Sequence, residues 1–156
     1  ARTGHNVDVL LDVIRNNLPE GPRLFDSEYM TDQTERAIAA ELIREQVLHY
    51  IDQEVPHGTA VLINKFEERT GANAVDEYDR DMVVIEADII CERESHKGII
   101  IGKKGSMLKE IGSQARLEIE NLLDTKVNLK LWVKVRKDWR DSDMLLKNYG
   151  FDKREL

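Results

Sequence analysis

A short glycine turn between two apolar segments constrains the fold of this chain more than any other feature. Gly102-Lys103-Lys104-Gly105 follows a run of three isoleucines, residues 99–101. Glycine tolerates a left-handed backbone, so the two glycines allow a sharp corner. After the turn, apolar residues recur at helical spacing, at Leu108, Ile111, Ala115, Ile119 and Leu122. The pattern therefore predicts two helices joined by the turn, the second one opening at Gly105.

The same turn has the chemistry of a phosphate-binding loop. Because Gly102 and Gly105 lack side chains, their backbone amides can approach a phosphodiester, and the N-terminus of the next helix favours an anion. Lys103 and Lys104 add two positive charges. G-x-x-G between helices is typical of a KH domain, which holds single-stranded RNA. By itself the tetrapeptide also suits a helix-capping turn with solvated lysines; the flanking isoleucines and the long helix favour RNA binding.

Patterns for catalysis, metal binding and nucleotide binding are incomplete. Gly98 lies too close to Gly102-Lys103-Lys104 for a P-loop, which also needs Ser or Thr after its lysine. The four histidines are scattered, without Cys or carboxylate partners at the spacing of a zinc site. We therefore expect no catalytic residue, no metal and no cofactor in this chain.

Charge is distributed unevenly along the chain. Residues 1–94 hold 9 basic and 21 acidic residues, whereas residues 95–137 hold 10 basic and 4 acidic ones. Screening limits electrostatic attraction to about 8–10 Å, so a local basic patch can bind RNA although the net charge is −7. Cys91 is the single cysteine, and no apolar run approaches the length of a membrane helix, which predicts a cytoplasmic protein.

Two helices are predicted before the glycine turn. The first covers residues 7–18, with Asn6 as its N-cap, and a linker rich in Pro and Gly follows it. The second begins near Asp32, with Glu35 completing a capping box. Its predicted buried face consists of Ile38, Leu42, Val47 and Ile51.

Three strands complete the predicted domain. Residues 59–66 are rich in β-branched side chains, residues 67–81 form a polar loop, and residues 83–91 and 127–135 alternate with period two. The resulting order, α-β-β-α-α-β, predicts an α/β (α+β) fold with helices on one face of a three-stranded sheet. This is the order of a type II KH domain. Residues 138–156 are expected to form a helical C-terminal extension.

The second face of the strand at residues 127–135 is basic and carries one aromatic residue. Lysines and Arg136 alternate there with Trp132. Such a face can contact RNA, but a solvated sheet face is the commoner meaning, and we favour the latter.

Several segments together resemble the Era GTPases, which join a Ras-like GTPase domain to a C-terminal type II KH domain. The matching segments are residues 35–45, 55–57, 97–103 and 131–135, with Trp139-Arg140. The resemblance implies that residues 1–30 are the last helix of an absent GTPase domain and its linker. Residues 31–137 would be the KH domain, and residues 138–156 the extension.

The resemblance also implies a function. The chain would bind the 3′ end of small-subunit ribosomal RNA during assembly of the 30S subunit, as a monomer. The absent domain would bind GTP and Mg²⁺ and hydrolyse GTP, and some family members associate peripherally with the membrane. A KH module of another assembly factor, or a protein-interaction domain with a structural glycine loop, are the alternatives.

The resemblance assigns roles to individual residues. The phosphate cradle would be residues 102–105, and Ile99, Ile100 and Leu108 would form an apolar floor beneath the bases. The remaining RNA contacts would come from Lys97, Lys109, Trp139 and Arg140. Two positions depart from the family pattern: Lys104 replaces a common glycine, and Gly58 replaces the usual serine.

Overall fold

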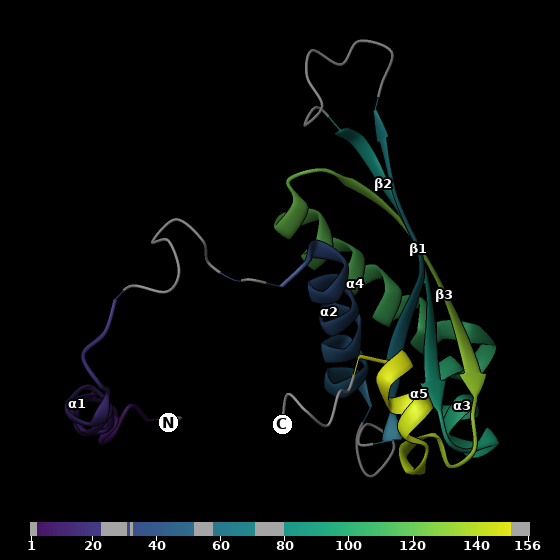
Figure 1. The fold of residues 1–156 in the computed structure, drawn as a ribbon. Helices are drawn as coiled ribbons and strands as arrows, with labels where there is room; N and C mark the ends of the chain where they lie inside the picture. Colours follow the sequence, from purple (N-terminus) through teal and green to yellow (C-terminus); the bar gives the residue numbers. More distant parts are fainter. Residues whose placement is uncertain (1–2, 23–30, 32, 52–57, 71–79, 151–156) are drawn as a thin grey trace. The chain divides into compact units, whose positions relative to one another are not determined.

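The computed structural model describes residues 3–22, 31, 33–51, 58–70 and 80–150, and the chain divides into two compact units, residues 1–32 and 33–156 (Figure 1). The first unit contains α1, Val7–Asn17. Asn6 occupies the N-cap position as predicted, but it has a φ of 61° and makes no side-chain capping hydrogen bond. The helix boundary is therefore confirmed, whereas the expected side-chain cap is not formed.

The second unit follows the predicted α-β-β-α-α-β order. Its helices and strands are α2 (Glu35–Tyr50), β1 (Ala60–Thr70), β2 (Arg80–Cys91), α3 (Glu94–Ile101), α4 (Ser106–Leu123), β3 (Lys126–Val135) and α5 (Asp143–Asn148). Two short 3-10 turns are η2 (Lys103–Gly105) and η3 (Trp139–Asp141).

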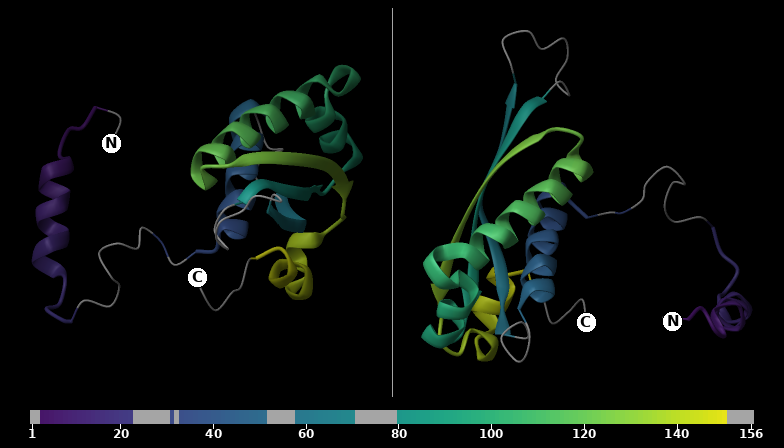
Figure 2. Two further views of the ribbon diagram at one scale, coloured as in Figure 1. Left: turned by 90° about the horizontal axis from the view of Figure 1, so that it is seen from above. Right: turned by 180° about the vertical axis from the view of Figure 1, so that it is seen from behind.

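The three strands form one mixed sheet in the order β1-β2-β3. β1 and β2 pair antiparallel, whereas β2 and β3 pair parallel, because α3 and α4 carry the chain back across the sheet. Helices α2 and α4 lie on one face, and α5 lies on the other (Figure 2). The predicted α/β fold with helices on one face of the sheet is thus confirmed, and α5 packs against the opposite face.

The main core lies between the sheet and the helices α2, α3 and α4. As predicted, the helix-facing residues of β2 are fully buried: Val83, Ile85, Ala87, Ile89 and Cys91. The opposite face of β2 is also largely covered. There Ala60, Ile90 and Trp139 form a second cluster, against which Leu145, Leu146 and Tyr149 pack.

The predicted buried faces of two helices differ from those in the structure. In α2, Ala39, Ile43 and Val47 are fully buried, whereas Ile38 and Leu42 are half-buried. In α4, Leu123 rather than Leu122 packs into the core. Ile38, Leu42 and Leu122 thus each lie one position before the buried residue, since the rotation of a helix depends on its packing. Other predicted positions are confirmed as buried: Val47, Ile51, Ile111, Ala115 and Ile119.

The start of α2 also differs from the prediction. The helix begins at Glu35, and the Thr34 hydroxyl accepts a hydrogen bond from the Ala37 N–H at 3.2 Å. Thr34 is therefore the N-cap. The predicted cap, Asp32, lies outside the described residues.

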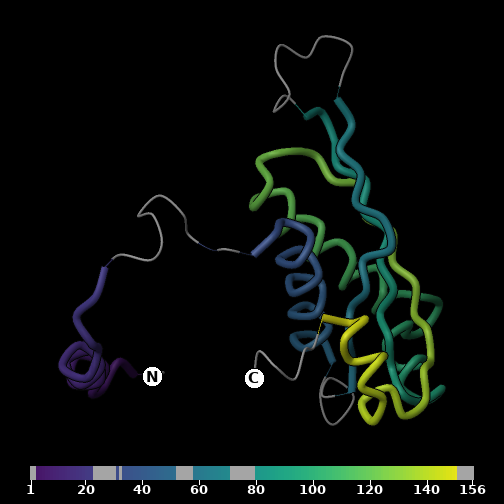
Figure 3. The backbone as a smooth tube through the Cα atoms, viewed as in Figure 1, coloured from purple at the N-terminus to yellow at the C-terminus, as the bar shows by residue number. Residues whose placement is uncertain are grey.

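The β1–β2 hairpin extends further than predicted (Figure 3). Residues 67–70 belong to β1 rather than to a loop, and the ladder continues to the pair Thr70↔Arg80. Ion pairs of Glu67 with Lys65 and Arg69 join charged side chains two residues apart along one face of the strand. The charged composition of this segment is thus that of a solvated strand; residues 71–79 lie outside the described part.

Candidate nucleic-acid interface

The glycine turn joins α3 to α4 with a backbone that requires Gly102. Gly102 has φ 70° and ψ 178°, and its N–H donates to the Gly98 carbonyl at 2.9 Å. A Cβ at this position would lie 2.6 Å from Met107 Cβ and 2.9 Å from Met107 N. Both the left-handed φ and the close approach of α4 therefore exclude a side chain here.

The next positive φ belongs to a residue that is not glycine. Lys104 has φ 55° and ψ 28°, a left-handed conformation that costs an L-residue about 1–2 kcal/mol. Its neighbour Gly105 has φ 79° and serves as the N-cap of α4. No side chain caps α4, but the Gly105 and Ser106 N–H groups donate to the Gly102 and Lys103 carbonyls within the turn. The helix dipole is directed to the loop, where it would favour an anion.

The predicted loop lysines point to solvent around this helix end. Lys103, Lys104 and Lys109 are exposed, and Lys97 is half-buried. The predicted apolar floor is divided: Ile99 is 49% exposed, whereas Ile100 is fully buried. Ile100 therefore supports α3 from the core, Ile99 is open to solvent, and Leu108 is half-buried and lines a groove along α4 and β3.

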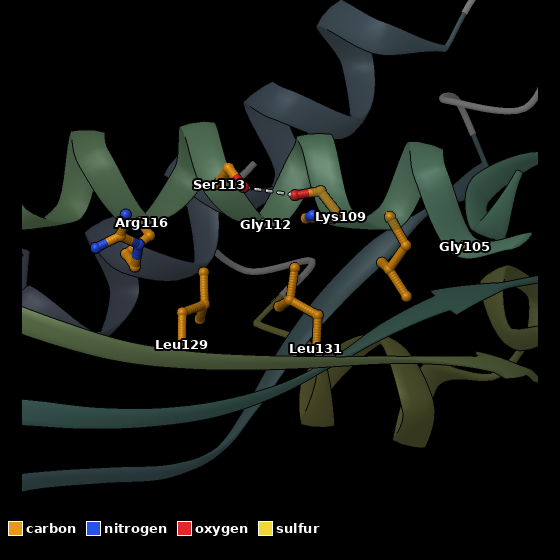
Figure 4. A pocket seen from close by; sticks show the side chains of 8 residues that line it. Gly105, Lys109, Gly112, Ser113, Arg116, Leu129 and Leu131 are labelled. Atoms are coloured by element: carbon orange, nitrogen blue, oxygen red, sulfur yellow. Dashed lines mark hydrogen bonds between the residues drawn. The ribbon is translucent and has the colours of Figure 1, made fainter.

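A groove of about 400 Å³ runs from the loop along α4 and β3 (Figure 4). Leu129 and Leu131 rise from β3 to form one wall, and α4 forms the other. The lining of α4 consists of Gly105, Leu108, Lys109, Gly112, Ser113 and Arg116. The groove thus combines apolar side chains, Leu108, Leu129 and Leu131, with two cations, Lys109 and Arg116. This combination suits bases on one side and phosphates on the other.

Gly112 and Arg116 give the groove its shape and charge. A Cβ on Gly112 would lie 3.4 Å from Leu131 Cδ1, so glycine leaves the α4 backbone open beside β3. Arg116 donates to Glu120 Oε1 at 3.1 Å, and the same oxygen accepts the Val127 N–H at 3.0 Å. Glu120 therefore fixes both the guanidinium and the start of β3.

Sequence reasoning missed five of the lining residues: Gly112, Ser113, Arg116, Leu129 and Leu131. A signal was present, because residues 109, 112, 113 and 116 share the helix face that begins with Lys109. The alternation at residues 127–135 places both leucines on one face of a strand but does not predict a groove beside it.

Of the residues assigned to RNA contact, Gly105, Leu108 and Lys109 line the groove, whereas Trp139 and Arg140 do not and are engaged within the fold. Trp139 is 3% exposed, donates its indole N–H to the Gly58 carbonyl at 3.2 Å, and packs edge-on against Tyr149. Arg140 forms a bidentate ion pair with Glu92, at 2.8 and 2.7 Å. Both side chains join η3 to the sheet. Their geometry favours anchoring of the extension over contact with a ligand.

Other chemistry finds little support among the described residues. Burial raises the pKa of the Cys91 thiol, so the nucleophilic thiolate is disfavoured. No three His, Cys, Asp or Glu side chains in the described part gather closely enough to hold a metal ion. No helix there is long and apolar enough to cross a membrane.

Comparison with known proteins agrees with this geometry. Residues 54–140 match the family model described as KH domain. The chain is 52% identical to the GTPase Era of Ruminiclostridium cellulolyticum over 93% of its own length, and 49% identical to that of Lactobacillus delbrueckii over 100%. It covers 46% and 49% of these relatives, so it spans about half their length.

Solved structures give the same result. A single-substitution variant of Aquifex aeolicus Era bound to GDP and AlF4⁻ is 41% identical with a TM-score of 0.80. An Era complex with MgGDPNP and nucleotides 1506–1542 of 16S ribosomal RNA is 41% identical with a TM-score of 0.81. In both cases the match covers 94% of this chain and 46% of the other.

Proposed function

The chain belongs to the KH domain family, in the form found in the C-terminal part of Era GTPases, and on this basis we propose that it binds single-stranded RNA. One observation carries the proposal: the glycine turn opens directly into the groove, since Gly105 belongs to both. A phosphodiester on the turn would therefore place its neighbouring bases between α4 and β3.

The binding mechanism follows from the groove residues. The amides of the first turn of α4 would hold a phosphate, with Lys103 and Lys104 as charge-assisted donors. Leu129 and Leu131 would contact base faces, and Lys109 and Arg116 would approach the backbone further along α4. Phosphate contacts of this kind position the strand, whereas base edges carry the sequence information.

We further propose the 3′ end of 16S ribosomal RNA as the ligand, in the setting of 30S subunit assembly. The RNA fragment in the matched Era complex supports this assignment. The proposed contacts come from four exposed residues of the predicted set, Ile99, Lys103, Lys104 and Lys109, and from the residues that line the groove. Trp139 and Arg140 would act indirectly, by holding the extension against the start of α3.

The whole protein is proposed to be a GTP-hydrolysing, Mg²⁺-dependent GTPase, because the curated relatives carry that name and are about twice as long. In that arrangement residues 1–30 would belong to the GTPase domain and its linker, residues 31–137 to the KH domain, and residues 138–156 to the extension. A cytoplasmic monomer with peripheral membrane association completes the proposal.

The test is a titration of this chain with a short single-stranded RNA carrying the rRNA 3′ end, beside a scrambled RNA. The variant Lys103→Glu with Lys104→Glu changes two exposed side chains of the loop. A matched control, Arg69→Glu with Lys147→Glu, makes the same change in net charge at exposed side chains of β1 and α5 that do not line the groove.

We expect preference for the rRNA sequence, loss of binding in the loop variant, and retention in the control. Equal binding of both RNAs, or a loop variant that binds as well as the wild type, would contradict the proposal. The second result would favour a protein-interaction domain with a structural glycine loop.

A further inference from the structure

The outward face of β3 carries an exposed basic row that the groove does not use. Side chains alternate between the faces of a strand, so these residues point away from Leu129 and Leu131. All of them are exposed: Lys126, Asn128, Lys130, Trp132, Lys134 and Arg136. We call this set the β3 outer row.

Trp132 is the centre of the row and is 44% exposed. Two lysines flank it and are held by carboxylates of β2. Lys130 Nζ lies 3.3 Å from Glu86 Oε1, and Lys134 Nζ lies 2.6 Å from Asp88 Oδ2. Asp88 is 3% exposed, so Lys134 is tied to a fixed point directly beside the indole. The ring is thus presented between two positioned cations.

The charge around Trp132 is positive along the strand. Residues 126–137 include five basic and no acidic residues. Glu86 and Asp88 offset two of them. Among the side chains that the structure describes, Lys126, Arg136 and Lys137 form no ion pair. The row therefore keeps a surplus of positive charge for an anionic partner.

The position of β3 connects this row to the groove. β3 lies at the edge of the sheet, and no other strand of the described part of the chain pairs with its free side. The cluster of Trp139, Leu145, Leu146 and Tyr149 covers the Ala60 and Ile90 part of the outer face and leaves Trp132 accessible. One face of β3 thus lines the groove and the other carries the row, only one strand thickness apart.

We propose that the β3 outer row is a second contact for single-stranded RNA. The RNA would leave the groove, cross the free edge of β3 and so reach the row. A base would stack on Trp132, and Lys126 and Arg136 would contact phosphates. An exposed aromatic between cations is the usual platform for unpaired nucleotides. The inference rests on the proposed function, since the groove supplies the first contact.

The test compares two RNAs, one of about four nucleotides that fills the groove and one extended by about ten unpaired nucleotides at either end. The variants are Trp132→Ala, Trp132→Phe, and Lys126→Gln with Arg136→Gln. Met144→Ala is the control, because Met144 is a large apolar residue that is 70% exposed and lies on α5, outside the row. Circular dichroism checks the fold of each variant.

We expect the wild type to bind the long RNA more tightly than the short one. Trp132→Ala should weaken binding of the long RNA about tenfold. Trp132→Phe should keep most of the affinity, and the glutamine variant should reduce the salt dependence for the long RNA alone. Short-RNA affinity should be unchanged in all three. Tryptophan emission should be quenched by the long RNA in the wild type but not in Trp132→Phe.

Four results would overturn the inference. The first is equal affinity of the wild type for both RNAs, and the second is an unchanged gain in affinity from the extension in both Trp132→Ala and the glutamine variant. The third is an equal loss of affinity for both RNAs in these variants. The fourth is an equal gain in affinity from a double-stranded extension. Failure of the wild type to bind the short RNA would overturn the proposed function as well. Intact short-RNA binding without any gain from the extension would overturn the second contact alone.

Discussion

The guanidinium of Arg80 donates to both carboxylate oxygens of Glu35, at 2.7 and 2.9 Å, and so joins the start of β2 to the start of α2. The same guanidinium donates to the Leu123 carbonyl at 3.3 Å, and the Arg80 carbonyl accepts the Thr125 hydroxyl at 2.9 Å. The Arg80 side chain therefore joins three elements, α2, β2 and α4, and its carbonyl also holds the turn between α4 and β3. This cluster fixes the end of α4 from which β3 begins.

The Arg80 pair should make stability depend on pH on the acid side. Hydrogen bonding from Arg80 lowers the pKa of Glu35 from its ordinary value of 4.5. A lowered folded-state pKa gives stability that is present above pH 4.5 and is lost as pH falls through the folded value. Because Glu35 is partly exposed, we expect Glu35→Gln to cost about 1 kcal/mol or less at pH 7. Urea denaturation at pH 7 and pH 3 measures the difference.

Glu41→Gln is the matched control for that prediction. Glu41 pairs with Arg44 on the same helix at 2.7 Å, without joining other elements. It should cost less than Glu35→Gln at pH 7. An equal loss of stability in both variants would contradict the special role of the Arg80 pair. The same conclusion would follow if Glu35→Gln lost as much stability between pH 7 and pH 3 as the wild type.

The three glycines around the turn should differ in their response to alanine. Gly102→Ala should destabilise the protein by about 2 kcal/mol or more, because strain and the clash with Met107 add. Gly105→Ala should cost about 1–2 kcal/mol from the left-handed φ alone, since space is open there. Gly98→Ala, within α3, should stabilise by up to about 1 kcal/mol. Thermal unfolding gives the order, and a different ranking would refute the described backbone.

Lys104→Gly should separate stability from RNA binding. Relief of the left-handed φ should raise the free energy of unfolding by about 1 kcal/mol. Loss of the charge should weaken RNA binding and reduce the slope of log K against log salt by about 0.7. The measurements are urea denaturation and RNA titration at several salt concentrations.

Lys103→Ala serves as the comparison, because it removes the neighbouring charge without changing a residue of positive φ. It should weaken RNA binding similarly and leave stability nearly unchanged. If Lys104→Gly proved less stable than the wild type, the strain assigned to Lys104 would be wrong.

Trp139→Ala should be among the most destabilising substitutions in the extension. The indole is buried and its N–H is bonded to Gly58, so its removal should cost about 3–5 kcal/mol. Trp139→Phe keeps the ring contact with Tyr149 but leaves the Gly58 carbonyl without its donor, and should cost less. Chemical denaturation measures both.

RNA titration of Trp139→Phe then tests the role of this position. Unchanged affinity of the folded variant would agree with anchoring of the extension. A loss of affinity without a loss of stability would instead support the direct RNA contact that the family resemblance implies.

Local patterns predicted those parts of the fold in which neighbours along the chain decide the outcome. The alternation at residues 83–91 placed five side chains in the core correctly, because a strand has only two faces. On the helices, Val47, Ile111, Ala115 and Ile119 were predicted correctly. Ile38, Leu42 and Leu122 each missed the buried position by one residue, since the rotation of α2 and α4 depends on their packing against the sheet. The hairpin was predicted too short because its charged residues suit a solvated strand as well as a loop.

Local patterns are sufficient for the glycine corner, the order of elements and the basic segment, because spacing and composition are properties of neighbouring residues. The tertiary structure was needed to show that Leu129 and Leu131 face a groove, since this requires α4 and β3 to lie at a set distance. It also decided that Trp139 is buried, through a hydrogen bond to Gly58, 81 residues earlier in the chain. Contacts across such separations depend on the packing of the whole sheet, which no local pattern encodes.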